Sequence, residues 1–236
     1  MKTYIGLTLL ASFLAAFPSL ISAADPSSEK ILHDTFIDSP EAIRWIGEAN
    51  WERVNDKANG ASDEVSLVSK NPQYSQLTVK LPGGEINPIA EKVILRMKVR
   101  VRLEGVPASD ISRLELRLSD SKAQNFYIGV FNPTMVRLGV QYATNAGESN
   151  IGQWQTQRLT RDEQYHIYTL EIHPSKRVIV SVDDTVFDDQ DIGDPDLSVV
   201  QAQVVFCAVP QSAGKWHIDD ISVTREASIS NPVQKP

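Results

Sequence analysis

Apolar and polar residues alternate along much of this chain, and the alternation is longest in residues 92–105, KVILRMKVRVRLEG. A period of two places successive side chains on opposite faces of a β-strand, so one face of this segment is expected in a core and the other in water. The same period recurs in residues 112–120, 165–173 and 176–184, and strand-like runs occupy residues 124–132, 134–142 and 197–210. The inward positions of the longest run are Val93, Leu95, Met97, Val99, Val101 and Leu103, and they alternate with Arg96, Lys98, Arg100 and Arg102.

Turn-forming residues separate these runs, as in PASD, HPSK and GDPD, and SPEAIRWIG is the single stretch suited to a helical turn. Strands with one apolar face need a second sheet to cover that face. The pattern therefore predicts an all-β protein, an antiparallel two-sheet β-sandwich. We expect one domain over residues 30–226, followed by a flexible tail at 227–236.

The last of the expected strands, KWHIDDISVTRE, raises a question of register. Ile218 and Ile221 are three residues apart, so a regular strand would point them to opposite faces. An extra residue in a β-bulge at Asp219 and Asp220 would return both to the core. A second interpretation is a structural Ca²⁺ site formed by these two carboxylates and Asp34, if the first and last strands pair.

Residues 1–24 have the pattern of a secretory signal peptide. Lys2 precedes an apolar run at residues 4–17, Pro18 ends that run, and Ser22 and Ala24 suit cleavage before Asp25. The run is shorter than a membrane-spanning helix requires. We therefore expect a secreted or periplasmic protein that does not insert in the membrane once the signal is cleaved.

The balance of charge and the few chemically reactive side chains exclude several classes of function. Without Lys2 the chain has 22 Lys and Arg against 30 Asp and Glu, and an acidic surface disfavours nucleic acid as a partner. One cysteine allows no intramolecular disulfide. No cofactor is indicated with certainty, because the cysteine and the histidines lack the spacing of a zinc site; they are Cys207, His33, His166, His173 and His217.

The two ends of the chain resemble a known family. ILHDTFIDSPEAIRWIGEANWERVNDKANG and WHIDDISV are similar to the opening and closing strands of concanavalin-A-like, or laminin-G-like, jelly-roll domains of secreted bacterial proteins. Asp183-Asp184 stands where that family usually has Asp-Gly, and Lys57 replaces the glycine expected after Asp56. The resemblance implies a jelly-roll fold, and one similar branch is the 3-keto-disaccharide hydrolase-like domain. The opening motif rests on Asp34, Phe36, Trp45, Trp51 and Val54.

Catalysis on such a scaffold would normally use two carboxylates on one strand face. The best candidate is Glu115, but its neighbours on the same face are Arg113 and Arg117. An ion-pair ladder explains this arrangement without catalysis. We keep a glycoside-active hydrolase that uses Glu115 with a second, unidentified group as an alternative function.

The remaining chemistry favours binding. Aromatic rings stack on sugars, and amide and guanidinium groups hydrogen-bond sugar hydroxyls. The leading hypothesis is an exported domain that binds polysaccharide or oligosaccharide without cleaving it, and a structural or adhesive cell-envelope domain is a further alternative. For each aromatic residue, core packing is the competing interpretation. The candidate ligand-binding residues are Trp154, Arg117, Asn125, Tyr127, Gln141 and Tyr142.

Overall fold

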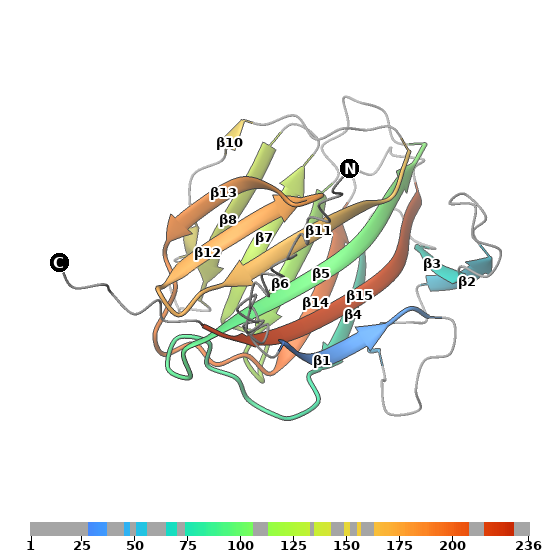
Figure 1. Ribbon diagram of the computed structural model, residues 1–236. Helices are drawn as coiled ribbons and strands as arrows, with labels where there is room; N and C mark the ends of the chain where they lie inside the picture. The colour runs from blue at the N-terminus through green and yellow to red at the C-terminus, as the bar shows by residue number, and fades with distance from the viewer. Residues whose placement is uncertain are drawn as a thin grey trace, which may run out of the picture.

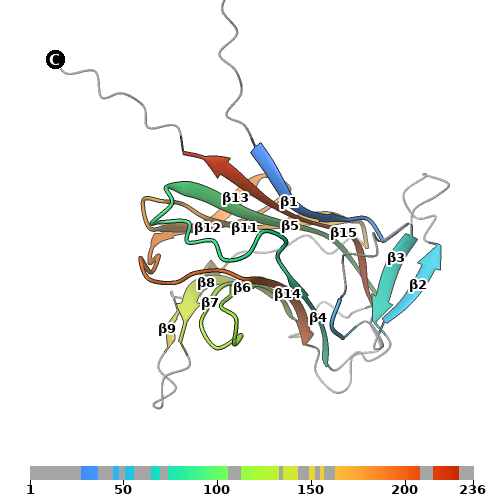
Figure 2. The same ribbon diagram turned by 90° about the horizontal axis from the view of Figure 1, so that it is seen from below.

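The computed structural model forms two stacked antiparallel β-sheets with the core between them (Figures 1 and 2). It describes residues 28–36, 45–47, 51–55, 65–69, 74–105, 113–132, 135–142, 149–151, 155–156, 163–207 and 215–228. None of these residues is helical, and no helix among them could cross a membrane. The expected signal peptide at 1–24 lies outside this part of the chain.

The first sheet has the strand order β13-β12-β11-β5-β15-β3-β2, and β1 also pairs with β15. It consists of β1 (Ser28–Asp34), β2 (Trp51–Asn55), β3 (Val65–Ser69), β5 (Val93–Glu104), β11 (His166–Ile172), β12 (Arg177–Val182), β13 (Thr185–Asp191) and β15 (Lys215–Ala227). The second sheet has the order β10-β8-β7-β6-β14-β4, and β9 also pairs with β8. It consists of β4 (Tyr74–Lys80), β6 (Arg113–Ser119), β7 (Phe126–Asn132), β8 (Met135–Gln141), β9 (Ser149–Ile151), β10 (Gln155–Thr156) and β14 (Gln201–Cys207).

The alternation in the sequence corresponds to burial in the structure. Along β5, the residues at odd positions from Val93 to Val101 are buried and those between them are half-buried. Both sheets contribute their inward side chains to one large apolar core. The expected antiparallel β-sandwich is therefore confirmed. Three aromatic residues link the layers, because Phe206 lies 5.2 Å from Trp51 and 4.7 Å from Trp216 between ring centroids.

The expected bulge is confirmed in β15. Ile218 pairs with Val101 and Ile221 pairs with Val99, and the register shifts between Ile218 and Asp220. Both isoleucines are 0% exposed. Asp219 is the extra residue, and it allows two core side chains three positions apart to face the same layer.

The first and last strands do pair, with Asp34 opposite Ile221. The Asp34 carboxylate is buried and accepts hydrogen bonds from the Phe36 backbone N–H at 2.8 Å and the Trp45 indole N–H at 2.7 Å. These three residues of the opening segment therefore contact one another, which ties residue 45 to the end of β1.

The turn between β12 and β13 uses Asp183 and Asp184, which have φ values of 49° and 62°. Two successive residues in the left-handed region characterise the tight hairpin turn in which glycine is common. Asp183 helps to hold the turn, because its carboxylate accepts the Ile167 backbone N–H at 2.9 Å.

Candidate functional site

The face of the second sheet that points away from the core carries most of the candidate residues. Its strands alternate, so side chains next to the core-facing ones point outward. We call this surface the outer face of the second sheet. It is defined by Tyr74, Gln76, Thr78 and Lys80 on β4, Gln201, Gln203, Val205 and Cys207 on β14, Arg113, Glu115, Arg117 and Ser119 on β6, Phe126, Ile128, Val130 and Asn132 on β7, and Arg137, Gly139 and Gln141 on β8.

A row of hydrogen bonds orders the polar side chains on β4. The Tyr74 hydroxyl donates to Gln76 Oε1 at 2.7 Å, and Gln76 Nε2 donates to Thr78 Oγ1 at 2.8 Å. On the neighbouring strands, Gln203 Nε2 donates to Ser119 Oγ at 3.3 Å. Polar groups that are already held in place lose little conformational entropy when they bind a ligand.

Tyr74 is the exposed aromatic of this row. The residue is 49% exposed, whereas most aromatic residues described in the structure are buried. Burial of its hydroxyl raises the pKa of Tyr74, and the positive charge of Arg117 partly opposes that rise. The ring and the guanidinium group therefore lie within electrostatic reach of each other on one surface.

Glu115 is an outward position of β6, but neighbouring side chains cover it. It is 2% exposed, and its two carboxylate oxygens pair with Arg113, at 2.6 Å, and with Arg117. The predicted ion-pair ladder is thus present, with its carboxylate buried. Arg117 also covers the Phe126 ring, 4.7 Å from guanidinium carbon to ring centroid. Among the outward positions of the described strands of the second sheet, no second carboxylate accompanies Glu115.

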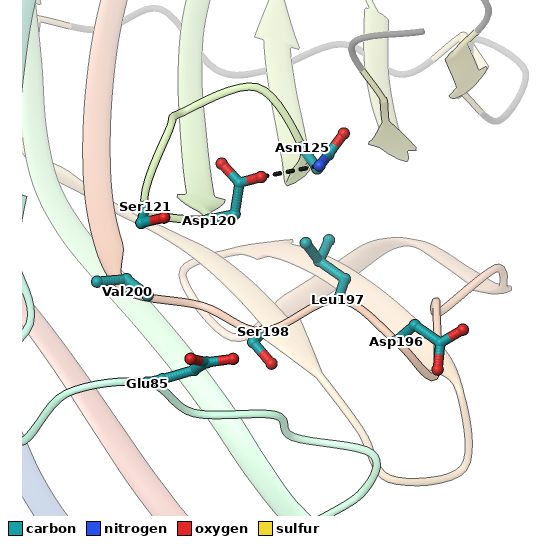
Figure 3. A pocket seen from close by; sticks show the side chains of 8 residues that line it. All are labelled: Glu85, Asp120, Ser121, Asn125, Asp196, Leu197, Ser198 and Val200. Atoms are coloured by element: carbon teal, nitrogen blue, oxygen red, sulfur yellow. Dashed lines mark hydrogen bonds between the residues drawn. The ribbon is translucent and has the colours of Figure 1, made fainter.

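A small pocket of about 210 Å³ opens at one end of the sandwich (Figure 3). There the turn between β6 and β7 meets the segment that leads into β14. Figure 3 shows Asn125 directed at Asp120, and its amide nitrogen donates to the Asp120 carboxylate at 2.8 Å. The pocket is lined by Glu85, Asp120, Ser121, Asn125, Asp196, Leu197, Ser198 and Val200.

The two candidate tyrosines contact Asp194, two residues before the pocket-lining Asp196. The Tyr127 hydroxyl donates to the Asp194 carbonyl at 2.9 Å, and the Tyr142 hydroxyl donates to the Asp194 carboxylate. Burial is the main cause that raises the pKa of both phenols, and the nearby Asp194 raises it further. Tyr127 is completely buried, which fits core packing and anchoring of the 194 segment. Gln141 is half-buried opposite Phe126 on the outer face.

The six predicted ligand-binding residues are therefore divided. Arg117 and Gln141 belong to the outer face, Asn125 lines the end pocket, and Tyr127 and Tyr142 hydrogen-bond Asp194. Trp154 lies outside the described residues. Sequence reasoning missed Tyr74 and Gln76, although the alternation in YSQLTVK marks both as one face of a strand.

The residues proposed for Ca²⁺ have other contacts. The Asp34 carboxylate faces Phe36 and Trp45, the Asp219 carboxylate pairs with Arg100, and the Asp220 carboxylate lies 3.3 Å from His33. Within the described part of the chain, no group of three or more His, Cys, Asp and Glu side chains is arranged to hold a metal ion. The calcium site stays a prediction.

No protein-family model and no curated protein sequence matches this chain. Solved structures do resemble it. The CBM2 module of the evolved Dit of Lactobacillus casei BL23 phage J-1 matches with a TM-score of 0.58 at 9% identity, over 86% of this chain and 98% of that one. A family 16 glycoside hydrolase, an endo-glucanase from Bacteroides ovatus, matches with a TM-score of 0.56 at 12% identity, over 81% and 99%.

The globular domain of Trypanosoma cruzi calreticulin is also similar, with a TM-score of 0.57 at 17% identity, over 83% of this chain and 88% of that one. At these identities the likeness concerns the fold. It confirms the concanavalin-A-like jelly roll that the sequence indicated. The branch resembling the 3-keto-disaccharide hydrolase-like domain stays a prediction.

Proposed function

We propose that this domain binds carbohydrate through the outer face of the second sheet and does not cleave it. The observation that carries the proposal is the ordered polar row on β4, in which an exposed Tyr74 is hydrogen-bonded to Gln76. An aromatic ring next to fixed amides offers a sugar both an apolar surface and hydrogen-bonding groups. Two proteins of similar structure, a CBM2 module and an endo-glucanase, support a sugar as ligand.

The absence of cleavage is the second part of the proposal. Both oxygens of Glu115 are held by arginines, so the carboxylate is placed to fix Arg113 and Arg117 rather than to donate a proton. The two guanidinium groups then keep defined positions on the surface. If the alternative were correct, the chain would release sugar from ordinary or 3-keto glycosides, and Glu115→Gln would abolish that release.

A glycan array followed by calorimetry tests binding. We expect at least one polysaccharide or oligosaccharide to bind, and Tyr74→Ala to weaken that binding about tenfold or more, since one stacked ring contributes on the order of 1–2 kcal/mol. Val186→Ala is the matched control, because Val186 is 56% exposed on the first sheet. Trp154→Ala tests the remaining aromatic candidate. Absence of any glycan binding would remove the proposal and favour a structural or adhesive domain.

We also propose that the domain acts outside the cytoplasm, as a secreted or periplasmic protein. The support is the pattern of residues 1–24. N-terminal sequencing of the protein recovered from the cell envelope or medium should begin at Asp25. A mature protein that still begins at Met1 would contradict export through this signal.

A further inference from the structure

The outer face of the second sheet carries an excess of positive charge on an otherwise acidic protein. The chain has a formal net charge of −7. The described strands nevertheless place Lys80, Arg113, Arg117 and Arg137 on this face, and Glu115 is the one carboxylate among their outward positions. A positive surface on a negative molecule focuses its field on anionic ligands.

The outward face of the first sheet shows that this excess is not general. There the arginines are matched by carboxylates: Arg96 pairs with Glu171 and Glu226, Arg100 with Asp219, Arg102 with Glu104, and Arg177 with Asp189. Those strands use arginine for ion pairs within the protein. On the second sheet, Arg113 and Arg117 instead share one carboxylate, so one of their two positive charges is not balanced by Glu115.

The cations also spread across the sheet. Lys80 lies on β4 and Arg137 on β8, which are separated by four strand spacings, ~19 Å at roughly 4.8 Å per strand. Burial lowers the pKa of Arg137, so its guanidinium group is partly withdrawn from water at this face. The outer face between these two strands contains the Gln203 amide and Arg117, and the polar row of Tyr74, Gln76 and Thr78 lies on β4 beside them.

We infer that the carbohydrate bound by this face is acidic, a polysaccharide or oligosaccharide whose sugar units carry carboxylate groups. This inference rests on the proposed function and names the class of its ligand. The planar guanidinium group of arginine fits a carboxylate with two parallel hydrogen bonds, and the neighbouring amides suit sugar hydroxyls. A nucleic acid is the less favoured polyanion, because the remaining surface is acidic and would repel a long phosphate backbone.

Calorimetry on the full chain with two matched polymers tests the inference. The probes are polygalacturonate, which carries a carboxylate on each sugar, and its fully methyl-esterified form, which is neutral. We expect polygalacturonate to bind at least tenfold more tightly, and its affinity to fall as salt is raised. The double variant Lys80→Gln and Arg137→Gln should weaken binding about five- to tenfold. This is the effect expected from losing two ion pairs with carboxylates of the ligand.

Lys98→Gln combined with Arg177→Gln is the control, since it removes the same charge from the first sheet. It should leave the affinity unchanged. Equal binding of the neutral and acidic polymers would overturn the acidic ligand and leave carbohydrate binding standing. If no glycan binds, the proposed function fails and the inference fails with it. Single-stranded RNA that binds as tightly as polygalacturonate, with the same loss in the variant, would overturn the inference in favour of a general polyanion surface.

Discussion

The guanidinium group of Arg100 on β5 pairs with the carboxylate of Asp219, the extra residue of the bulge in β15. One ion pair therefore marks the point where the register of the two longest strands shifts. The pairing explains why an acidic residue occupies a position between two core isoleucines: the bulge turns Asp219 toward a cation on the outward face of β5.

Deletion of Asp219 should leave a folded protein, because Ile218 and Ile221 would then be two residues apart, and a regular strand keeps both on the core face. The deletion removes the ion pair with Arg100, which should cost about 1.5–3 kcal/mol. Asp219→Asn, which keeps the bulge, should cost only about 1 kcal/mol. Urea unfolding followed by circular dichroism compares the two. A deletion variant that fails to fold would show that β15 needs the bulge for more than placing its two isoleucines on the same face.

The turn at Asp183 and Asp184 allows a gain in stability. Asp184 has a φ of 62° and no described contact that requires its side chain, so Asp184→Gly should raise the unfolding free energy by up to about 1 kcal/mol. Asp183→Gly should do the opposite, because it removes the acceptor for the Ile167 N–H. Thermal melting of both variants checks the pair, and a destabilised Asp184→Gly would contradict this account of the turn.

Glu171 should contribute to the loss of stability in acid. Burial alone would raise its pKa, but hydrogen bonds and charges from His173 and Arg96 lower the pKa of Glu171 from 4.5 to about 2. A pKa depressed in the folded state adds stability that is complete above the unfolded pKa and is lost as the pH falls from about 4.5 towards 2.

The size of this effect is about 1–2 kcal/mol, because the side chain is partly solvated. Unfolding free energies measured in urea at several pH values give the slope for the wild type and for Glu171→Gln. The slope between pH 4.5 and 2 should be smaller in the variant. Identical slopes would show that Glu171 does not titrate in this window.

Gly47 should be irreplaceable at the edge of β4. Its φ is 97°, and a Cβ would lie 2.2 Å from the Gln76 carbonyl oxygen. Gly83 has a φ of 93° with nothing within 4 Å of a Cβ, so Gly83→Ala measures the backbone strain alone. We expect Gly47→Ala to lower stability by at least about 1 kcal/mol more than Gly83→Ala does. Equal losses would mean that the Ile46–Thr78 bridge adjusts freely.

Removal of divalent metal tests the calcium prediction. If Asp34, Asp219 and Asp220 bind Ca²⁺, EDTA should lower the melting temperature and added Ca²⁺ should restore it. An unchanged melting temperature in both conditions would leave the three carboxylates with the protein contacts described above, to Trp45, Arg100 and His33.

The strands could be predicted wherever one face is apolar and the other polar, as in β5. The bulge could be predicted from Ile218 and Ile221, because both side chains must face the core although they are three residues apart. β7 gave only a general strand signal, since Phe126, Ile128 and Val130 make its outer positions apolar as well.

The candidate site was harder to predict. Arg117, Gln203 and Thr78 lie side by side only because β6, β14 and β4 are neighbours, although these strands are far apart in the sequence. The periodicity shows which way a side chain points, but the order of strands in a sheet depends on long-range packing. Tyr127 illustrates the same limit, because its sequence surroundings do not show that its hydroxyl reaches Asp194.

The position of β15 affects when this protein can fold. The C-terminal strand lies between β5 on one side and β1 and β3 on the other. Among the described pairings, β1, β2 and β3 reach the rest of their sheet only through β15. The first sheet therefore closes only after β15 has been made, through contacts between segments far apart in the sequence, and such long-range pairing makes folding slow.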